Sequence, residues 1–140
     1  TIVASGKGRH PVAALTNGAR CTIFAADGTP AAARKQWLAG VLEVAGAVQV
    51  DAGAAQALRN GGSLLPVGVT AVSGKFSRGD VVRLRDSNGG ELGRGLAEYA
   101  ADEAARIAGR KSDEIEDILG YRGRAVMIHR DELVLFDNER

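Results

Sequence analysis

The sequence contains few of the residues that form covalent cross-links and metal sites. Its 140 residues include one cysteine, Cys21, and two histidines, His10 and His129. A single cysteine cannot form a disulfide within the chain, which favours a reducing cytoplasm as its location. Neither histidine has a second ligand at a recognisable spacing, so no metal site is predicted. We expect Cys21 to be a small apolar core residue rather than a catalytic thiol.

Long apolar runs are also missing. No run approaches the roughly 18 residues that a membrane-spanning helix needs, so no membrane partner is expected. The first residues lack an initiator methionine and a signal-peptide pattern, and they open directly on a strand-like apolar run. We therefore expect the sequence to be part of a longer protein. The net charge of +1 argues against a uniformly basic nucleic-acid binder but leaves local basic patches open.

The triplet His129-Arg130-Asp131 matches the first three residues of a protein-kinase catalytic loop. In that loop an asparagine follows the aspartate by five residues and holds a metal ion. Here Phe136 stands at that position, and the sequence has no Gly-rich loop, strand lysine or Asp-Phe-Gly motif to accompany the triplet. The protein-kinase interpretation is therefore excluded. We expect His129 and Arg130 to end a strand and Asp131 to begin a turn.

Residues 1–40 predict a strand, a loop, a helix, a second strand, a turn and a second helix. The expected strands cover residues 1–5 and 21–26, and the expected helices cover 11–18 and 30–40. This segment is too small to form a hydrophobic core alone.

The pattern changes after residue 40 to short strands separated by tight turns. The strands are expected over residues 46–51, 63–74, 81–86, 91–99 and 124–136, the last as one or two strands. Helices are expected to begin after Asp51, which can cap the first of them, and near residues 101 and 112. Strands at this spacing with tight turns predict a small barrel, so the fold class is mainly β with α.

A basic strand face is the best positive signal. Arg83 and Arg85 alternate with Val82 and Leu84 and should therefore lie on one side of their strand. We expect this pair to lie near Arg59 and the break after the first barrel helix, where backbone N–H groups of two glycines can approach phosphates closely. The same arginines could instead simply keep an exposed strand face soluble. The residues proposed for this surface are Arg59, Asn60, Gly61, Gly62, Arg83 and Arg85.

A family resemblance extends this interpretation. Residues 50–99, with "GGSLLPVGV", Gly79-Asp80 and "GRGLAEY", closely resemble a PUA domain, the small RNA-associated barrel. The segments "ARKQWLAG" upstream and "SDEIEDILGY" and "VMIHRDELVL" downstream resemble the C-terminal region of the bacterial glutamate 5-kinase family. Together these motifs span essentially the whole chain.

The resemblance implies a PUA-type small β-barrel with flanking helices, preceded by a β/α remnant of an amino-acid-kinase domain. Residues 1–40 would be that remnant and residues 41–140 the PUA domain with its extension, with a core over about 46–124. Residues 34–45 would join the two. The sequence departs from the family at Cys21, where the family usually has glycine before Thr22.

The resemblance also implies a function. The parent enzyme would phosphorylate the γ-carboxylate of L-glutamate with ATP and magnesium, the first step of proline biosynthesis. The family's catalytic motifs match no residue here, so the chain is expected to have no catalytic, cofactor or metal residue and no activity alone. The PUA part would modulate assembly or feedback inhibition, with the upstream kinase domain, structured RNA and a second copy as expected partners. The alternative is a free-standing PUA-type RNA-binding protein that uses the six residues named above.

Overall fold

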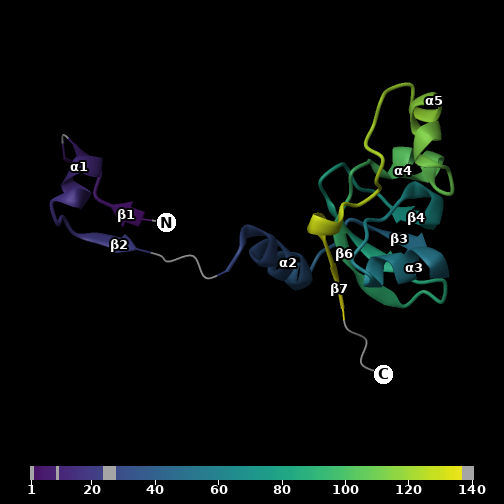
Figure 1. Ribbon diagram of the computed structural model, residues 1–140, viewed down its shortest axis with the longest axis horizontal. Helices are drawn as coiled ribbons and strands as arrows, with labels where there is room; N and C mark the ends of the chain where they lie inside the picture. Colours follow the sequence, from purple (N-terminus) through teal and green to yellow (C-terminus); the bar gives the residue numbers. More distant parts are fainter. Residues whose placement is uncertain (1, 9, 24–27, 137–140) are drawn as a thin grey trace. The chain divides into compact units, whose positions relative to one another are not determined.

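The computed structural model describes residues 2–8, 10–23 and 28–136. The chain divides into two compact units, Thr1–Pro30 and Ala31–Arg140, each of which is described by itself. Figure 1 shows their elements in sequence colours.

The first unit is a small β-α-β piece, in agreement with the sequence pattern. Strand β1 (Ile2–Ala4) precedes helix α1 (Pro11–Thr16) and pairs antiparallel with strand β2 (Cys21–Ile23). All residues of both strands are exposed. The expectation that Cys21 is a core residue is therefore wrong, because a sheet of two three-residue strands has no second layer of described residues to bury it.

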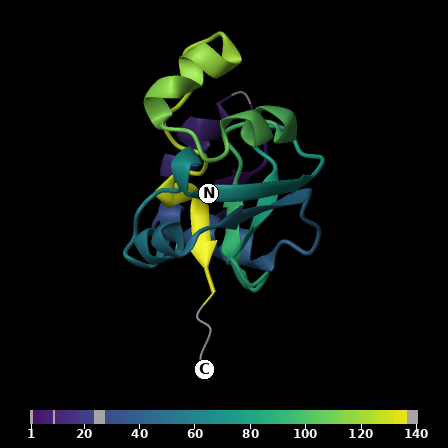
Figure 2. The same cartoon turned by 90° about the vertical axis from the view of Figure 1, so that its right-hand side faces the viewer.

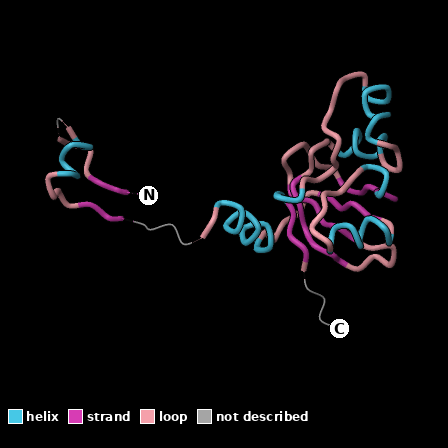
Figure 3. Tube along the Cα trace, in the orientation of Figure 1, coloured by secondary structure: helices cyan, strands magenta, loops and turns pink. Residues whose placement is uncertain are grey.

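The second unit is built around a five-stranded sheet, whose strands are the magenta segments on the right of Figure 3. The strand order is β4-β3-β5-β6-β7, in which β3 and β5 run parallel and the other neighbours run antiparallel. The strands are β3 (Gly46–Val50), β4 (Val69–Gly74), β5 (Val81–Arg85), β6 (Glu91–Leu96) and β7 (Leu133–Leu135). The sheet and its helices confirm the predicted small β-structure with flanking helices.

Helices and short 3₁₀ turns connect and cover the strands (Figure 2). The α-helices of this unit are α2 (Pro30–Gly40), α3 (Ala52–Arg59), α4 (Ala101–Ile107) and α5 (Ile115–Leu119). The 3₁₀ turns are η1 (Pro66–Gly68), η2 (Ser112–Glu114) and η3 (Arg130–Glu132). Asp51 begins α3 as predicted, because its carboxylate accepts a hydrogen bond from the N–H of Ala54 at 2.7 Å.

The hydrophobic core lies inside this second unit. Val82 and Leu84 of β5 are fully buried, whereas Arg83 and Arg85 are half-buried on the opposite side, which confirms the predicted alternation. Other members of the core, contributed by the strands, α3, α4 and the C-terminal segment, are Val48, Val50, Leu58, Leu64, Ile107, Met127 and Ile128. Burial of this apolar surface stabilises the unit and fixes the positions of the polar residues around it.

Two expected strands are interrupted. In the stretch 63–74, Leu64 forms an isolated bridge with Ile128, and η1 separates this bridge from β4. In the stretch 124–136, η3 separates the same bridge from the short β7. Pro66 explains the first break, because its missing N–H and fixed φ favour a turn over a ladder position.

Candidate anion-binding site

The glycines after α3 form a helix C-cap. Gly61 has a φ of +85°, and its N–H donates to the carbonyl of Leu58 at 3.0 Å. The N–H of Gly62 donates to the carbonyl of Ala57 at 2.9 Å. These two bonds, with a left-handed residue at the first position after the cap, make a Schellman motif. The expectation that both N–H groups are free to approach phosphate is therefore wrong.

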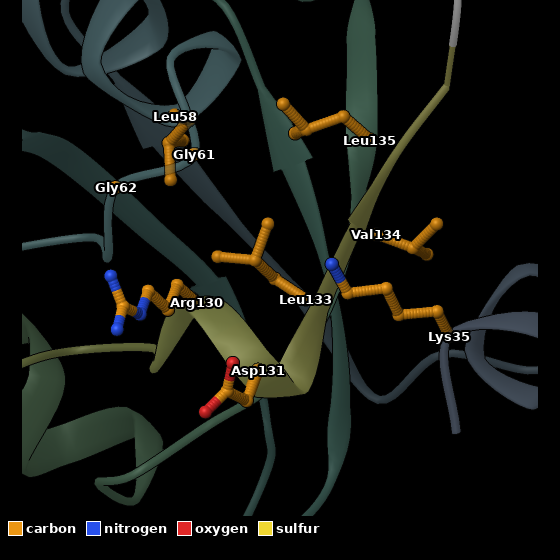
Figure 4. A pocket seen from close by; sticks show the side chains of 9 residues that line it. All are labelled: Lys35, Leu58, Gly61, Gly62, Arg130, Asp131, Leu133, Val134 and Leu135. Carbon is orange, nitrogen blue, oxygen red and sulfur yellow. The ribbon is translucent and has the colours of Figure 1, made fainter. Parts of the chain in front are cut away.

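The same turn nevertheless borders a cavity of about 480 Å³. Gly61 and Gly62 form one side of it, and the other sides come from α2, η3 and β7 (Figure 4). Its charged lining residues are Lys35 from α2 and Arg130 and Asp131 from η3. The triplet that looked like a kinase loop thus contributes two residues to a hollow in the surface.

The two cations of this cavity have no acidic partner. Within residues 2–8, 10–23 and 28–136, no carboxylate lies within 4.0 Å of the side-chain nitrogens of Lys35 or Arg130. The carboxylate of Asp131 lies in the same lining, so the three charged side chains carry two positive charges and one negative charge. The net positive charge of this lining favours anions.

The local backbone fixes the position of Arg130. Its N–H donates to Oγ of Ser63 at 2.9 Å, and Nδ1 of His129 accepts from the N–H of Asp131 at 3.2 Å. His129 is therefore the N-cap of η3 rather than the last residue of a strand, which corrects one detail of the sequence analysis. The predicted turn is present, but it begins at Arg130 and not at Asp131, so Arg130 is also not a strand residue.

Four aliphatic side chains complete the lining of the cavity. Leu58 and Leu133 belong to the core, with exposed fractions of 2% and 5%, and Val134 and Leu135 are partly buried beside them. In Figure 4 the side chain of Lys35 extends from α2 so that its amine ends beside Leu133. The cavity therefore has two cations and one carboxylate in its lining, beside aliphatic side chains that are mostly buried.

The other predicted site residues do not share this cavity. Arg83 and Arg85 line a second, smaller hollow of about 170 Å³, beside Gly46 and Gly74. Arg59 is exposed at the end of α3 and lines neither hollow. The structure thus brings Gly61 and Gly62 together with Lys35 and Arg130, and not with the strand arginines.

Part of the charge on the strand face is neutralised within the chain. Arg83 lies directly opposite Arg94 across the β5–β6 hairpin. Oε1 of Glu91 lies 3.8 Å from Nε of Arg83 and 3.1 Å from Nε of Arg94. Arg94 also donates to the carbonyl of Val41, and its guanidinium carbon lies 5.3 Å from the centre of the Phe136 ring. Arg94 is therefore a structural residue that holds the segment after α2.

The sequence analysis missed Lys35 and Arg130 as site residues. They are far apart in the chain and line one cavity because α2 is joined to η3, where Nη1 of Arg34 lies 3.0 Å from Oε1 of Glu132. No local pattern announces such a contact. The one local signal concerned Arg130, which directly precedes the acidic pair Asp131-Glu132 before a strand.

Two further findings limit the kinds of site. Among the described residues, no helix combines the length and the apolar character that crossing a membrane requires. In the same residues, no three histidine, cysteine, aspartate or glutamate side chains are grouped as metal ligands would be.

Comparison with known proteins assigns the class. The PUA domain family matches residues 46–119, which is more than half of the chain, and the chain belongs to that family. It is also 58% identical over 134 residues to a glutamate 5-kinase of Rhizobium johnstonii and 57% identical to glutamate 5-kinase 1 of Rhizobium meliloti. In both cases 96% of this chain is matched, to the C-terminal part of the relative.

The match covers only part of each relative. The chain spans 34%, about a third, of the length of these glutamate 5-kinases. Among solved structures, a PUA domain from Aeropyrum pernix K1 is 34% identical over 60% of this chain and 41% of that chain, with a TM-score of 0.44. The family match and the two relatives confirm the resemblance to PUA domains and to the C-terminal region of glutamate 5-kinases.

Proposed function

We propose that this chain is the C-terminal module of a glutamate 5-kinase and serves that enzyme as an accessory domain. The observation that carries the proposal is the identity of 58% across 96% of the chain, which extends well beyond the PUA domain on both sides. Residues 1–40 are then the end of an amino-acid-kinase domain, and residues 41–140 the PUA domain with its extension. The β-α-β arrangement of the first unit supports this division.

The parent enzyme would transfer a phosphoryl group from ATP, with magnesium, to the γ-carboxylate of L-glutamate in the cytoplasm. Such transfer needs a metal, a lysine and a phosphate-cradling backbone positioned together. The family places that machinery in the part of the relatives that this chain does not match. The chain alone is therefore inactive, and its main partner is the kinase domain of the same protein.

The proposal is tested by comparing glutamate-dependent ADP formation by the full-length gene product with that of the 140-residue chain. We expect turnover by the first and none by the second. A truncated product that keeps the upstream kinase domain and ends within residues 41–50 should keep turnover but lose part of its regulation or assembly. Turnover by the 140-residue chain, or a full-length product without glutamate kinase activity, would refute the proposal.

A second candidate function is RNA binding by a free-standing PUA protein. The observation that favours it is that Arg59 and Arg85 have no carboxylate within 4.0 Å in the described part of the chain. The proposed contacts are Arg59, Asn60, Arg83 and Arg85, with Gly61 and Gly62 allowing close approach of the backbone although their N–H groups are engaged in the helix cap. In this alternative, the exposed strand β1 could pair with β1 of a second copy and so form a homo-oligomer.

The RNA candidate is tested by titrating a structured RNA hairpin at several salt concentrations. Binding through phosphates must weaken steeply with salt, because released counterions drive it. The double variant Arg83→Ala/Arg85→Ala should bind more weakly and with a smaller salt slope. Unchanged affinity in this variant would remove the strand arginines from the interface.

A further inference from the structure

We infer that the smaller hollow, beside Arg83 and Arg85, is a binding site for one free oxyanion of the inorganic phosphate type. The hollow has a volume of about 170 Å³. This is below the range of about 300–1,000 Å³ that is usual for sites of small organic molecules, so the hollow suits a group of a few heavy atoms and not a nucleotide. The inference goes beyond the proposed function, because it depends neither on the kinase domain nor on RNA.

The hollow exists because small and large side chains are neighbours on the face of the sheet that points away from the core. In the register of the sheet, Ser73 of β4 is paired with Ala47 of β3, and Ala47 is paired with Arg83 of β5. Paired residues point to the same face, so two small side chains adjoin a long one. Gly46 and Gly74 extend the lining without any side chain. The hollow is therefore held by the strands themselves and not by a loop.

Arg83 has a buried donor that lacks an acceptor. Its Nε is buried, and no atom of the described residues accepts a hydrogen bond from it. Oε1 of Glu91 lies 3.8 Å from this Nε, which exceeds hydrogen-bond length, and instead accepts from Nε of Arg94 at 3.1 Å. A buried donor without an acceptor is costly and rare in native proteins. The guanidinium of Arg83 is therefore available to an anion in the hollow that it lines.

Arg85 supplies a second cation. It stands two residues after Arg83 on the same strand, so both side chains leave the same face. Within residues 2–8, 10–23 and 28–136, no carboxylate lies within 4.0 Å of the side-chain nitrogens of Arg85. The neighbouring Asp86 is engaged elsewhere, since its Oδ1 accepts from the N–H groups of Asn88 and Gly90 in the hairpin turn. None of the described residues that line the hollow is acidic.

A tetrahedral oxyanion fits these donors better than a planar carboxylate. The two guanidinium groups belong to β5, and the hydroxyl of Ser73 belongs to β4 on the other side of Ala47. Oγ of Ser73 lies 3.5 Å from the carbonyl oxygen of Ala47, a length at which a hydrogen bond is weak, so the hydroxyl can turn to a ligand. Donors on different sides need oxygens that point in several directions, which phosphate and sulfate have and acetate lacks.

The surroundings favour a free ion over a polymer. Arg94, which is paired with Arg83 across the hairpin, is bonded to Glu91 and to the carbonyl of Val41. Arg59 does not line the hollow. A long nucleic acid needs a continuous basic track, and these internal contacts interrupt it.

The experiment titrates the ¹⁵N-labelled 140-residue chain with sodium phosphate at constant ionic strength and follows amide chemical shifts. Sulfate and acetate are the comparison ions, and a structured RNA hairpin tests whether the phosphate comes from a polymer. Arg83→Gln and Arg85→Gln each remove one cation. Ser73→Val removes the hydroxyl and fills part of the hollow without a change of charge. The matched control is Arg59→Gln, an exposed arginine outside the hollow, and far-UV circular dichroism confirms that each variant is folded.

We expect phosphate to cause saturable shifts at the amides that surround the hollow, with sulfate similar and acetate weaker. Arg83→Gln and Arg85→Gln should each weaken phosphate binding by about tenfold or more, as loss of a charge-assisted hydrogen bond implies. Ser73→Val should weaken it as well, and Arg59→Gln should leave it unchanged.

Four results would overturn the inference. The first is the absence of any saturable shift with phosphate, and the second is equal binding of acetate and phosphate. The third is an equal loss of binding in Arg59→Gln and in the two strand variants, or no loss in Ser73→Val, because general charge attraction would then explain the shifts. The fourth is binding of the RNA hairpin through Arg83 and Arg85 without binding of free phosphate.

Discussion

Nη1 of Arg34 lies 3.0 Å from Oε1 of Glu132, a residue 98 positions further along the chain. This ion pair joins α2 to η3, the two elements that carry the cations of the cavity. Leu38, on the same helix, is fully buried. The helix before the PUA domain is therefore packed against it and is not a free linker.

The ion pair should contribute little to stability. The side chains of Arg34 and Glu132 are 52% and 27% exposed, so solvent and salt screen their attraction. A double-mutant cycle with Arg34→Gln and Glu132→Gln, followed by urea denaturation, should give a coupling below about 1 kcal/mol that shrinks as salt is added. A coupling well above this value, or one insensitive to salt, would show that the pair is buried more deeply than described.

Removing Glu98 and removing its two arginine partners should lower the free energy of unfolding by different amounts. The Glu98 side chain is 6% exposed and lies 3.5 Å from Nη2 of Arg78 and 3.3 Å from Nε of Arg124, which are both more than half exposed. Glu98→Gln leaves two solvated arginines and should cost about 1 kcal/mol of unfolding free energy. Replacing Arg78 and Arg124 together with methionine leaves a buried, unpaired carboxylate and should cost about 3 kcal/mol.

Thermal or urea unfolding of both variants measures this difference. The order of the two costs is the diagnostic feature, because it depends on which charge is left without water. If Glu98→Gln proves the more damaging change, desolvation of the carboxylate is not the dominant effect.

Gly61 should be required for its backbone conformation alone. It has a φ of +85°, and no atom lies within 4 Å of the position where a Cβ would stand. Gly61→Ala should therefore destabilise the fold by about 1 kcal/mol through backbone strain and not through a clash. Gly53→Ala is the matched control, since its Cβ would meet only Oδ1 of Asp51 at 3.4 Å, and it should stabilise α3 by about 0.5 kcal/mol. If Gly61→Ala proves as stable as the parent chain, the Schellman cap is not formed as described.

Tyr121 should ionise late in an alkaline titration. Its hydroxyl donates to Oε1 of Glu103 at 2.7 Å, and this hydrogen bond to a carboxylate raises the pKa of Tyr121 from 10.0 to about 12. Burial is the main cause that raises the pKa of Tyr99, the other tyrosine of the chain. Because the folded-state pKa of Tyr121 is raised, the bond stabilises the fold fully below pH 10 and is lost as the pH rises from 10 through 12.

Tyrosinate absorbance measures this titration directly. The parent chain should show little ionisation at pH 10. Glu103→Gln should move the pKa of Tyr121 back toward 10, and Tyr121→Phe identifies its share of the signal. A titration that Glu103→Gln leaves unaltered would contradict the hydrogen bond as the cause.

Local signals in the sequence predicted local structure well. Asp51 predicted the start of α3, because an N-cap side chain bonds an N–H three residues later. The alternation of Val82 and Leu84 with arginines predicted β5. Gly120 ends α5 in a left-handed conformation, as a glycine after a helix suggests. In each case the signal and the structure lie within one or two turns of chain.

Long-range relations were beyond such signals. Nothing local shows that β3 pairs in parallel with β5, or that β7 completes the sheet beside β6. The candidate site could not be predicted, because Lys35 and Arg130 line one cavity only where α2 packs against η3. The use of the Gly61 and Gly62 N–H groups inside the helix cap also depends on geometry that the two letters do not reveal.

The central claim is that this PUA domain works as the C-terminal module of a larger glutamate 5-kinase. An antibody raised against the 140-residue chain tests it on an immunoblot of the cells that make the protein. The account predicts a single band at about three times 14.5 kDa, because the chain spans 34% of its relatives. A single band at 14.5 kDa would contradict it and would make the free-standing RNA-binding protein the leading account.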